Sequence, residues 1–168
     1  MGDRHDARRR GELITERAPD FADALPDGGV LLGLDLGTKT IGTAFCDAGW
    51  RFATNGKTLP RGKWARDREA LSALIAQRHV KGIVLGLPRN MNASEGPRTQ
   101  ASRAFARNIA EAFTLPVLLW DERWSTLSAE AAMIGQDVSR SRRAASIDSH
   151  AAAIILQGAI DRLAGGVI

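Results

Sequence analysis

Two almost wholly apolar runs, each following a segment with helical spacing, constrain the fold of this chain more than any other feature. The runs are "IVLGLP" at residues 83–88 and "LPVLLW" at residues 115–120. The segments before them, residues 64–80 and 97–113, have apolar residues every three to four positions, as an amphipathic helix does. Apolar strands of this kind are typical of a parallel sheet covered on both faces. The pattern predicts two helical crossovers, and both runs should lie parallel to an earlier strand.

The earlier strand is predicted at residues 30–36, and it opens a short antiparallel meander. A tight turn at residues 37–39 leads to a second strand at residues 40–46, and a third is predicted within residues 50–58. Two further helices are expected near residues 126–136 and 147–163. The predicted fold class is α/β: a five-stranded mixed sheet, with three antiparallel strands and then two parallel strands, and helices on both faces.

The N-terminal segment differs from the remainder in pattern and in charge. Residues 1–28 are polar, lack a sustained period and carry 5 basic and 7 acidic side chains, a net charge of −2. We expect them to form a disordered extension. Residues 29–168 carry 18 basic and 12 acidic side chains, a net charge of +6, and should form one domain. A basic, arginine-rich domain suits a partner that carries phosphate.

Other classes of protein fit the sequence poorly. No apolar stretch approaches the roughly 20 residues that cross a bilayer, and the charged N-terminus does not resemble a secretory signal. The single cysteine, Cys46, lies in an apolar run, so we expect a buried thiol, and no Cys/His spacing suggests zinc. We therefore expect a cytoplasmic protein that does not associate with membranes.

Acidic side chains stand where the predicted parallel strands end. Asp35 is near the end of the first strand, and Asp121 and Glu122 follow the last one. Asp148 should lie in the first turn of the final helix. Ligands of open α/β sheets bind at the carboxyl ends of the strands, so these carboxylates could meet at one edge. Each acid alone could also be a turn residue, a helix cap or a surface ion-pair partner.

A cluster of carboxylates has a definite chemical consequence. Like charges repel, so one carboxylate would take up a proton unless a cation were bound. Mg²⁺ or Mn²⁺ binds carboxylate and phosphate oxygens. Two such ions can activate a water and stabilise the leaving oxygen of a phosphodiester. The cofactor expected from this pattern is Mg²⁺ or Mn²⁺, with two ions in the site.

Four stretches of the chain resemble the YqgF/RuvX family of the RNase H-like superfamily. They are "LLGLDLGTKTIGTAFCD", "IVLGLPRNMNASEGP", "LLWDERWSTLSAEAAM" and "IDSHAAAIILQ", and the match spans about residues 30–163 in order. Members are described as candidate Holliday-junction resolvases and as nucleases that mature the 5′ end of pre-16S rRNA. The resemblance implies an RNase H-like fold and a metal-dependent phosphodiesterase.

The resemblance also implies roles for individual residues. Asp35, Glu122 and Asp148 would be the catalytic acids and metal ligands, although Asp121 stays open as an alternative to Glu122. One departure is Ala93, which stands where the family commonly has glycine. Five further motif positions would bind substrate or hold the acids: Lys39, Asn90, Arg123, Ser125 and Thr126.

Arginines near the expected acidic edge could hold a polyanion. Arg89, Arg98 and the run Arg140, Arg142 and Arg143 lie in predicted loops or helix starts. Cationic side chains bind nucleic acid by releasing counterions from its phosphates. The alternative is a solvated charged loop.

The sequence therefore predicts a metal-dependent endonuclease acting on nucleic acid. Processing of the 5′ end of pre-16S rRNA is favoured because the resemblance points to it, and structured RNA is the expected substrate. Resolution of branched DNA and a non-catalytic nucleic-acid-binding module remain alternatives. A kinase of the actin-like class also begins with a D-x-G-T turn, but it needs a second domain that 168 residues cannot supply. Both a monomer and a homodimer remain open.

Overall fold

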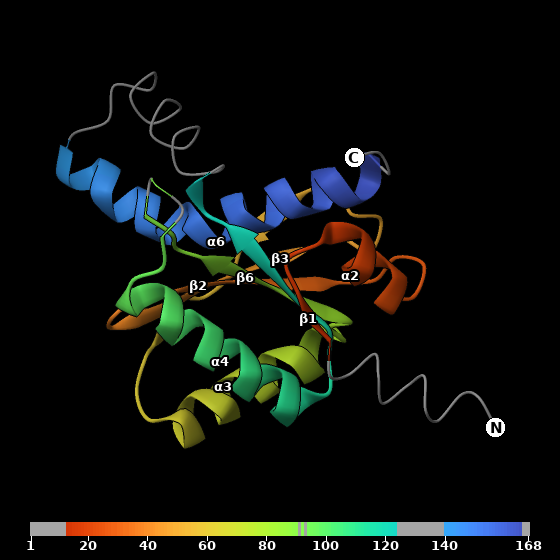
Figure 1. Ribbon diagram of the computed structural model, residues 1–168, viewed down its shortest axis with the longest axis horizontal. Coiled ribbons are helices and arrows are strands. Elements are labelled where there is room, and N and C mark those ends of the chain that lie inside the picture. Colours follow the sequence, from red (N-terminus) through yellow and green to blue (C-terminus); the bar gives the residue numbers. More distant parts are fainter. Residues whose placement is uncertain (1–12, 91, 93, 124–139, 166–168) are drawn as a thin grey trace.

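The computed structural model describes residues 13–90, 92, 94–123 and 140–165, with the backbone alone described for residues 140–149. The described chain forms a seven-stranded mixed sheet with helices on both faces (Figure 1). The strand order is β1-β7-β6-β2-β3-β4, and β5 pairs with β3 outside this path. The parallel pairs are β1 with β7, β7 with β6 and β6 with β2, whereas β3 is antiparallel to its partners. The predicted α/β class and mixed sheet are confirmed.

The strands that form the centre of the sheet are those with the most apolar sequences. Gly82–Leu87 (β6) and Val117–Asp121 (β7) are buried along their whole length. Their neighbours are Leu31–Leu36 (β2) and Thr40–Cys46 (β3). Short strands complete the sheet: Ile14–Thr15 (β1), Ala53–Asn55 (β4) and Leu59–Pro60 (β5).

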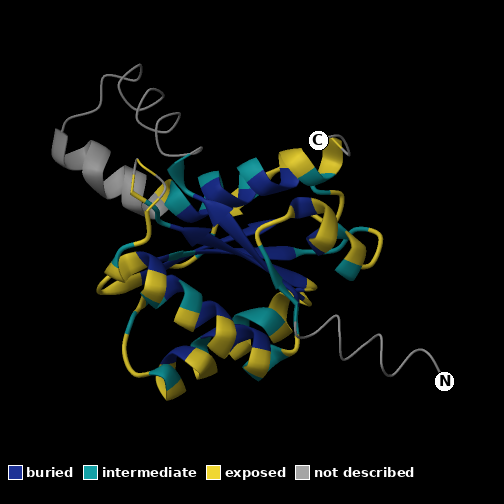
Figure 2. Ribbon diagram, viewed as in Figure 1, coloured by how far each residue is buried: buried dark blue, intermediate teal, exposed yellow. Residues whose placement is uncertain are grey.

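Among the described residues, helices lie on both faces of the sheet (Figures 1 and 2). Trp64–Arg78 (α3) and Pro97–Phe113 (α4) pack on one face, against alternate residues of β2, β6 and β7. Ala18–Ala24 (α2) and Arg140–Gly165 (α6) pack on the other face, against the residues between them. The central strands of the sheet are thus mostly dark blue in Figure 2, because both of their faces are buried.

The predicted third strand is wrong in detail. Residues 50–58 form only β4, and β5 follows as a separate strand, so the sheet has more than the five strands expected. The pairing with β3 shifts by one residue between them, from Ala44 opposite Asn55 to Ile41 opposite Leu59. The Gly56 N–H donates to the Thr43 carbonyl at 2.8 Å, and the Thr43 hydroxyl donates to the Lys57 carbonyl at 2.5 Å. The first bond continues the β3–β4 ladder, and the second lies where one extra residue enters the outer strand, as at a β-bulge.

The expected disorder of residues 1–28 is wrong for residues 14–24, and residues 1–12 lie outside the described part. Ile14 and Thr15 pair with Val117 and Leu118 of β7. Helix α2 follows, and its Phe21 is completely buried among residues of β2 and α6. These elements are too short to show a period in the sequence, so tertiary packing decides their structure.

The final helix begins earlier than expected. It starts at Arg140 and not near residue 147, so Arg140, Arg142 and Arg143 lie in α6 and not in a loop. Asp148 is consequently in the third turn of the helix and not in its first. Arginine and alanine favour helix, and no glycine or proline interrupts residues 140–149, which explains the extension. The predicted helix near residues 126–136 lies outside the described residues.

Gly33 allows α6 to lie close to the sheet, which gives a first prediction. A Cβ at Gly33 would stand 2.8 Å from the Leu156 Cβ and 3.0 Å from the Ala152 carbonyl oxygen. Replacing Gly33 with Ala should lower the free energy of unfolding by about 1–3 kcal/mol, as overpacking of a core does. Urea denaturation measures this change. Gly165→Ala is the matched control, because nothing lies within 4 Å of that position, and equal losses in the two variants would contradict the close packing.

The structure offers nothing that could traverse a lipid bilayer: among the described residues, every helix is too short or too polar to do so.

Candidate active site

Asp35 lies near the carboxyl end of β2, on the face that α6 covers. Its neighbours Leu34 and Leu36 belong to the core on the α3 and α4 side, and alternation along a strand places Asp35 on the opposite face. Gly33, two residues earlier, faces Leu156 of α6, in agreement with this assignment. Asp35 is half-buried, so its carboxylate is at the edge of the sheet and not in the core.

Glu122 meets Asp35 although 86 residues separate them in sequence. It follows the last residue of β7, and its backbone N–H donates to the Leu87 carbonyl at 3.2 Å. Its side chain lies over Gly86 of β6, where an added Cβ would overlap the Glu122 carboxylate and approach Ile155 Cδ1 to 2.6 Å. The Glu122 and Asp35 side chains are hydrogen-bonded to each other. The structure thus brings two predicted acids together at one edge.

The two carboxylates hold a proton between them. Burial raises the pKa of Glu122 to about 8, and the charge of Asp35 and the hydrogen bond with it act in the same direction. Arg98 opposes this rise in the Glu122 pKa but does not cancel it. Near neutral pH the pair therefore carries less than two negative charges unless a cation takes the proton's place.

The shared proton makes stability depend on pH. Folded protein binds the Glu122 proton more tightly than unfolded protein, whose glutamates have an ordinary pKa. In EDTA the free energy of unfolding should therefore fall as the pH rises from about 5 to 8, through the raised pKa. Denaturation at three pH values measures the slope. Glu122→Gln should remove this contribution, and an unchanged slope in that variant would show that another group causes it.

Asp121 points away from this pair. It is buried, and Arg123 binds it through Nη2 at 2.6 Å and through Nε at 3.0 Å, while Arg89 Nη1 lies at 3.8 Å. Burial acts to raise the pKa of Asp121, but the hydrogen bonds from Arg123 outweigh it and hold the pKa below its ordinary value. Strand alternation places consecutive residues on opposite faces. The open choice between the two acids therefore favours Glu122 as the partner of Asp35.

The arginines near the edge have different surroundings. Arg89 is bound to Glu16, which follows β1, and lies 3.8 Å from Glu95. Arg98 stands in the first turn of α4, is exposed, and forms no ion pair with any described residue. The positive charge of Arg98 opposes the rise in the pKa of Glu122. Arg98 is thus placed to meet a phosphate beside the acidic pair, whereas Arg89 is paired within the protein.

Lys39 and Asn90 lie on loops at the same edge. Lys39 is exposed in the turn between β2 and β3, and its carbonyl accepts a hydrogen bond from the Arg61 N–H at 2.9 Å. Asn90 follows β6, and its amide donates to the Ser94 hydroxyl at 2.8 Å, which closes the loop. The loop geometry at Ala93 lies outside the described residues. Substrate binding by Lys39, Asn90 and Arg123 stays a prediction.

Several predicted site residues cannot be placed. Ser125 and Thr126 lie outside the described residues, and so do the side chains of Asp148, Arg140, Arg142 and Arg143. The backbone of Asp148 is four residues, about one helical turn, before the buried Ala152 of α6. Among the described side chains no group of three or more potential metal ligands occurs. The described part of the site is therefore a pair of acids.

Gly86 is a site residue that the sequence analysis missed. Its lack of a side chain leaves the space that the Glu122 carboxylate occupies between β6 and Ile155 of α6. A glycine inside an otherwise apolar strand often marks a close approach of another group. That signal was present in "IVLGLP", but it does not say which group approaches.

Comparison with known proteins adds the family context. A family model described as RuvX, Holliday junction resolvase, matches residues 29–162. A protein of Novosphingobium aromaticivorans named "Putative pre-16S rRNA nuclease" is 61% identical over 153 residues, which cover 91% of this chain and 98% of that protein. A relative of the same name from Sphingopyxis alaskensis is 62% identical over 151 residues, covering 90% of this chain and 99% of the relative.

Among solved structures, the fold is similar to RuvC of T. thermophilus in complex with a Holliday junction substrate. The TM-score is 0.52 at 15% sequence identity, and the match covers 82% of this chain and 96% of that one. At this identity the similarity concerns the fold alone, and it confirms the predicted RNase H-like class.

Proposed function

This chain belongs to the RuvX family, and from that premise we propose that it is a metal-dependent endonuclease that processes the 5′ end of pre-16S rRNA. The resemblance inferred from the four motifs is confirmed by the family match. We extend the expected nuclease domain of residues 29–168 to include β1 and α2, because these elements belong to its sheet and core. We place its action in the cytoplasm, where bacterial rRNA precursors are processed. The observation that carries the proposal is the contact between Asp35 and Glu122 at the carboxyl edge of the sheet.

The donor set of the site fits a hard divalent cation. Two carboxylates from distant segments, one in β2 and one directly after β7, are held together, and one retains a proton that a cation would displace. Mg²⁺ prefers such oxygen ligands. We propose that Asp35, Glu122 and Asp148 hold one or two Mg²⁺ or Mn²⁺ ions. When bound, these ions supply an activated water and stabilise the leaving oxygen of the phosphodiester.

The residues of the chain position the substrate for this chemistry. Arg98 is exposed beside the acids and can bind a phosphate oxygen, which brings the backbone of the nucleic acid to the edge. The Thr99 hydroxyl donates to the Pro88 carbonyl, which joins the start of α4 to the end of β6. This bond fixes the position of Arg98 relative to the acids. Lys39 and Asn90 would contact the substrate from the neighbouring loops.

A cleavage assay with two substrates tests the proposal. With Mg²⁺ or Mn²⁺ the protein should cut a 5′-labelled pre-16S rRNA fragment at or near the mature end, and EDTA should abolish the cut. A four-way DNA junction is the second substrate. Preferential cutting of the junction would replace RNA processing by DNA resolution, and binding of both substrates without any metal-dependent cutting would contradict the nuclease assignment.

A further inference from the structure

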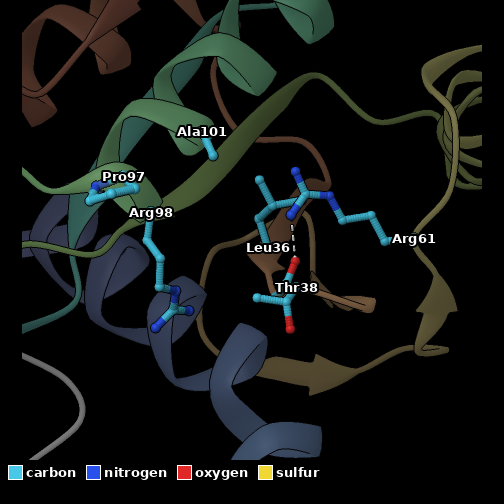
Figure 3. A pocket seen from close by; sticks show the side chains of 7 residues that line it. Leu36, Thr38, Arg61, Pro97, Arg98 and Ala101 are labelled. Carbon is cyan, nitrogen blue, oxygen red and sulfur yellow. Dashed lines mark hydrogen bonds between the residues drawn. The ribbon is translucent and has the colours of Figure 1, made fainter.

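A hollow of about 160 Å³ opens at the carboxyl edge of the sheet (Figure 3). It lies between the turn after β2, the residue after β5 and the first turns of α4. The proposed chemistry uses only one of the residues around it. The lining consists of Leu36, Gly37, Thr38, Arg61, Pro97, Arg98 and Ala101.

The hollow and the acids lie on opposite sides of the same edge. Leu36 follows Asp35 directly in β2, and the two side chains point to opposite faces. Arg98 lies between the hollow and the acids. It lines the hollow, and its positive charge lowers the pKa of Glu122. In Figure 3 its guanidinium extends away from Ala101 and toward α6. A nucleic-acid strand with one phosphate at the acids and Arg98 would cross the edge toward the hollow.

The lining fits a flat aromatic ring better than a free anion. Leu36, Pro97 and Ala101 present apolar surface. The Arg61 guanidinium is held in place, since its Nη1 donates to the Gly37 carbonyl at 2.7 Å (Figure 3). A held planar cation stacks well on an aromatic face. The volume is also below the roughly 300 Å³ at which pockets for drug-sized ligands begin, so a single ring is the appropriate size.

We propose that this hollow binds one unpaired nucleobase of the substrate, next to the bond that is cut. The proposal rests on the nuclease function, which it deepens by adding a base-binding subsite. Arg61 stacks on the base, the apolar lining excludes water from its other face, and Arg98 binds the adjoining phosphate. The subsite would require a single-stranded nucleotide at this point of the substrate, whatever structure surrounds it.

Photocrosslinking tests this subsite directly. Pre-16S rRNA fragments with 4-thiouridine at successive positions around the mature 5′ end are irradiated with the full-length protein in Ca²⁺. One position should crosslink to a peptide that contains Thr38 or residues 97–101. Ala101→Phe fills the hollow and should lower the yield by about tenfold, the scale of one lost stacking contact. Ala76→Phe, at an exposed position of α3, is the matched control and should keep the wild-type yield.

Each outcome decides for or against the subsite. Thr38→Trp fills the hollow from the exposed turn, so it replaces Ala101→Phe if circular dichroism shows that the latter variant is unfolded. Crosslinks that map only to other peptides, or a yield unchanged by the filling variant, would overturn the proposal. If the protein cleaves normally but these crosslinks are absent, the base-binding subsite is refuted and the nuclease function stands. If these crosslinks form but the protein cuts neither RNA nor DNA, the nuclease function is refuted and base binding in the hollow is supported.

Discussion

Replacing Asp35 with Asn is expected to lower the rate of metal-dependent phosphodiester cleavage by about 1,000-fold or more. The neutral amide weakens cation binding, and cation chemistry contributes several kcal/mol to such reactions, about tenfold in rate per 1.4 kcal/mol. The fold should not suffer, because the substitution removes a charge that faces Glu122 at close range. Cleavage of labelled RNA under single-turnover conditions measures the rate.

The control for this substitution is Asp23→Asn, at an exposed position of α2. This helix lies against Gly82 at the start of β6, at the opposite end of the strands from the acids. It makes the same chemical change far from the acids, so its rate should equal that of the wild type. A rate for Asp35→Asn within tenfold of the wild type would remove Asp35 from the reaction and leave the acidic pair without a catalytic role.

Replacing Glu122 with Gln and Asp121 with Asn should give opposite patterns of activity and stability. Glu122→Gln should lower the cleavage rate by about 100-fold or more, since it removes a cation ligand. Its free energy of unfolding at pH 8 should equal or exceed that of the wild type. Asp121→Asn should leave the rate within about tenfold. It should lower the free energy of unfolding by about 1–3 kcal/mol, because it weakens the buried bonds to Arg123.

The pair of variants is a sharp test because the two residues are adjacent in sequence. Cleavage rates and urea denaturation are measured on both proteins. A large loss of rate in Asp121→Asn with a stable fold, together with an active Glu122→Gln, would exchange the roles of the two acids. Loss of rate in both, at unchanged stability, would mean that both acids contact the reacting groups.

Much of the sheet could be predicted because its strands carry strong local signals. The run at residues 83–88 differs from β6 by one residue at each end, and residues 40–46 match β3. Strand β1 and helix α2 could not be predicted, since each has too few residues for a pattern and is held by β7 and by the burial of Phe21. The early start of α6 shows that serine and arginine in a sequence do not identify a loop.

The site was predictable in its location but not in its details. The topology placed Asp35 and the acids at the end of the last strand at one edge, and the structure agrees. Which of Asp121 and Glu122 meets Asp35 depends on the face to which each points, and this requires the last residue of β7 to be known. The pairing of Arg89 with Glu16 was not predictable, because Glu16 belongs to the segment expected to be disordered.

A crystal of the protein grown with Mn²⁺ and measured for anomalous scattering tests the central proposal most directly. The proposal predicts a strong anomalous peak at coordination distance from carboxylate oxygens of both Asp35 and Glu122, and its loss in crystals of Asp35→Asn. A well-ordered site in which these two carboxylates still share their proton at saturating Mn²⁺, with every anomalous peak elsewhere, would contradict it.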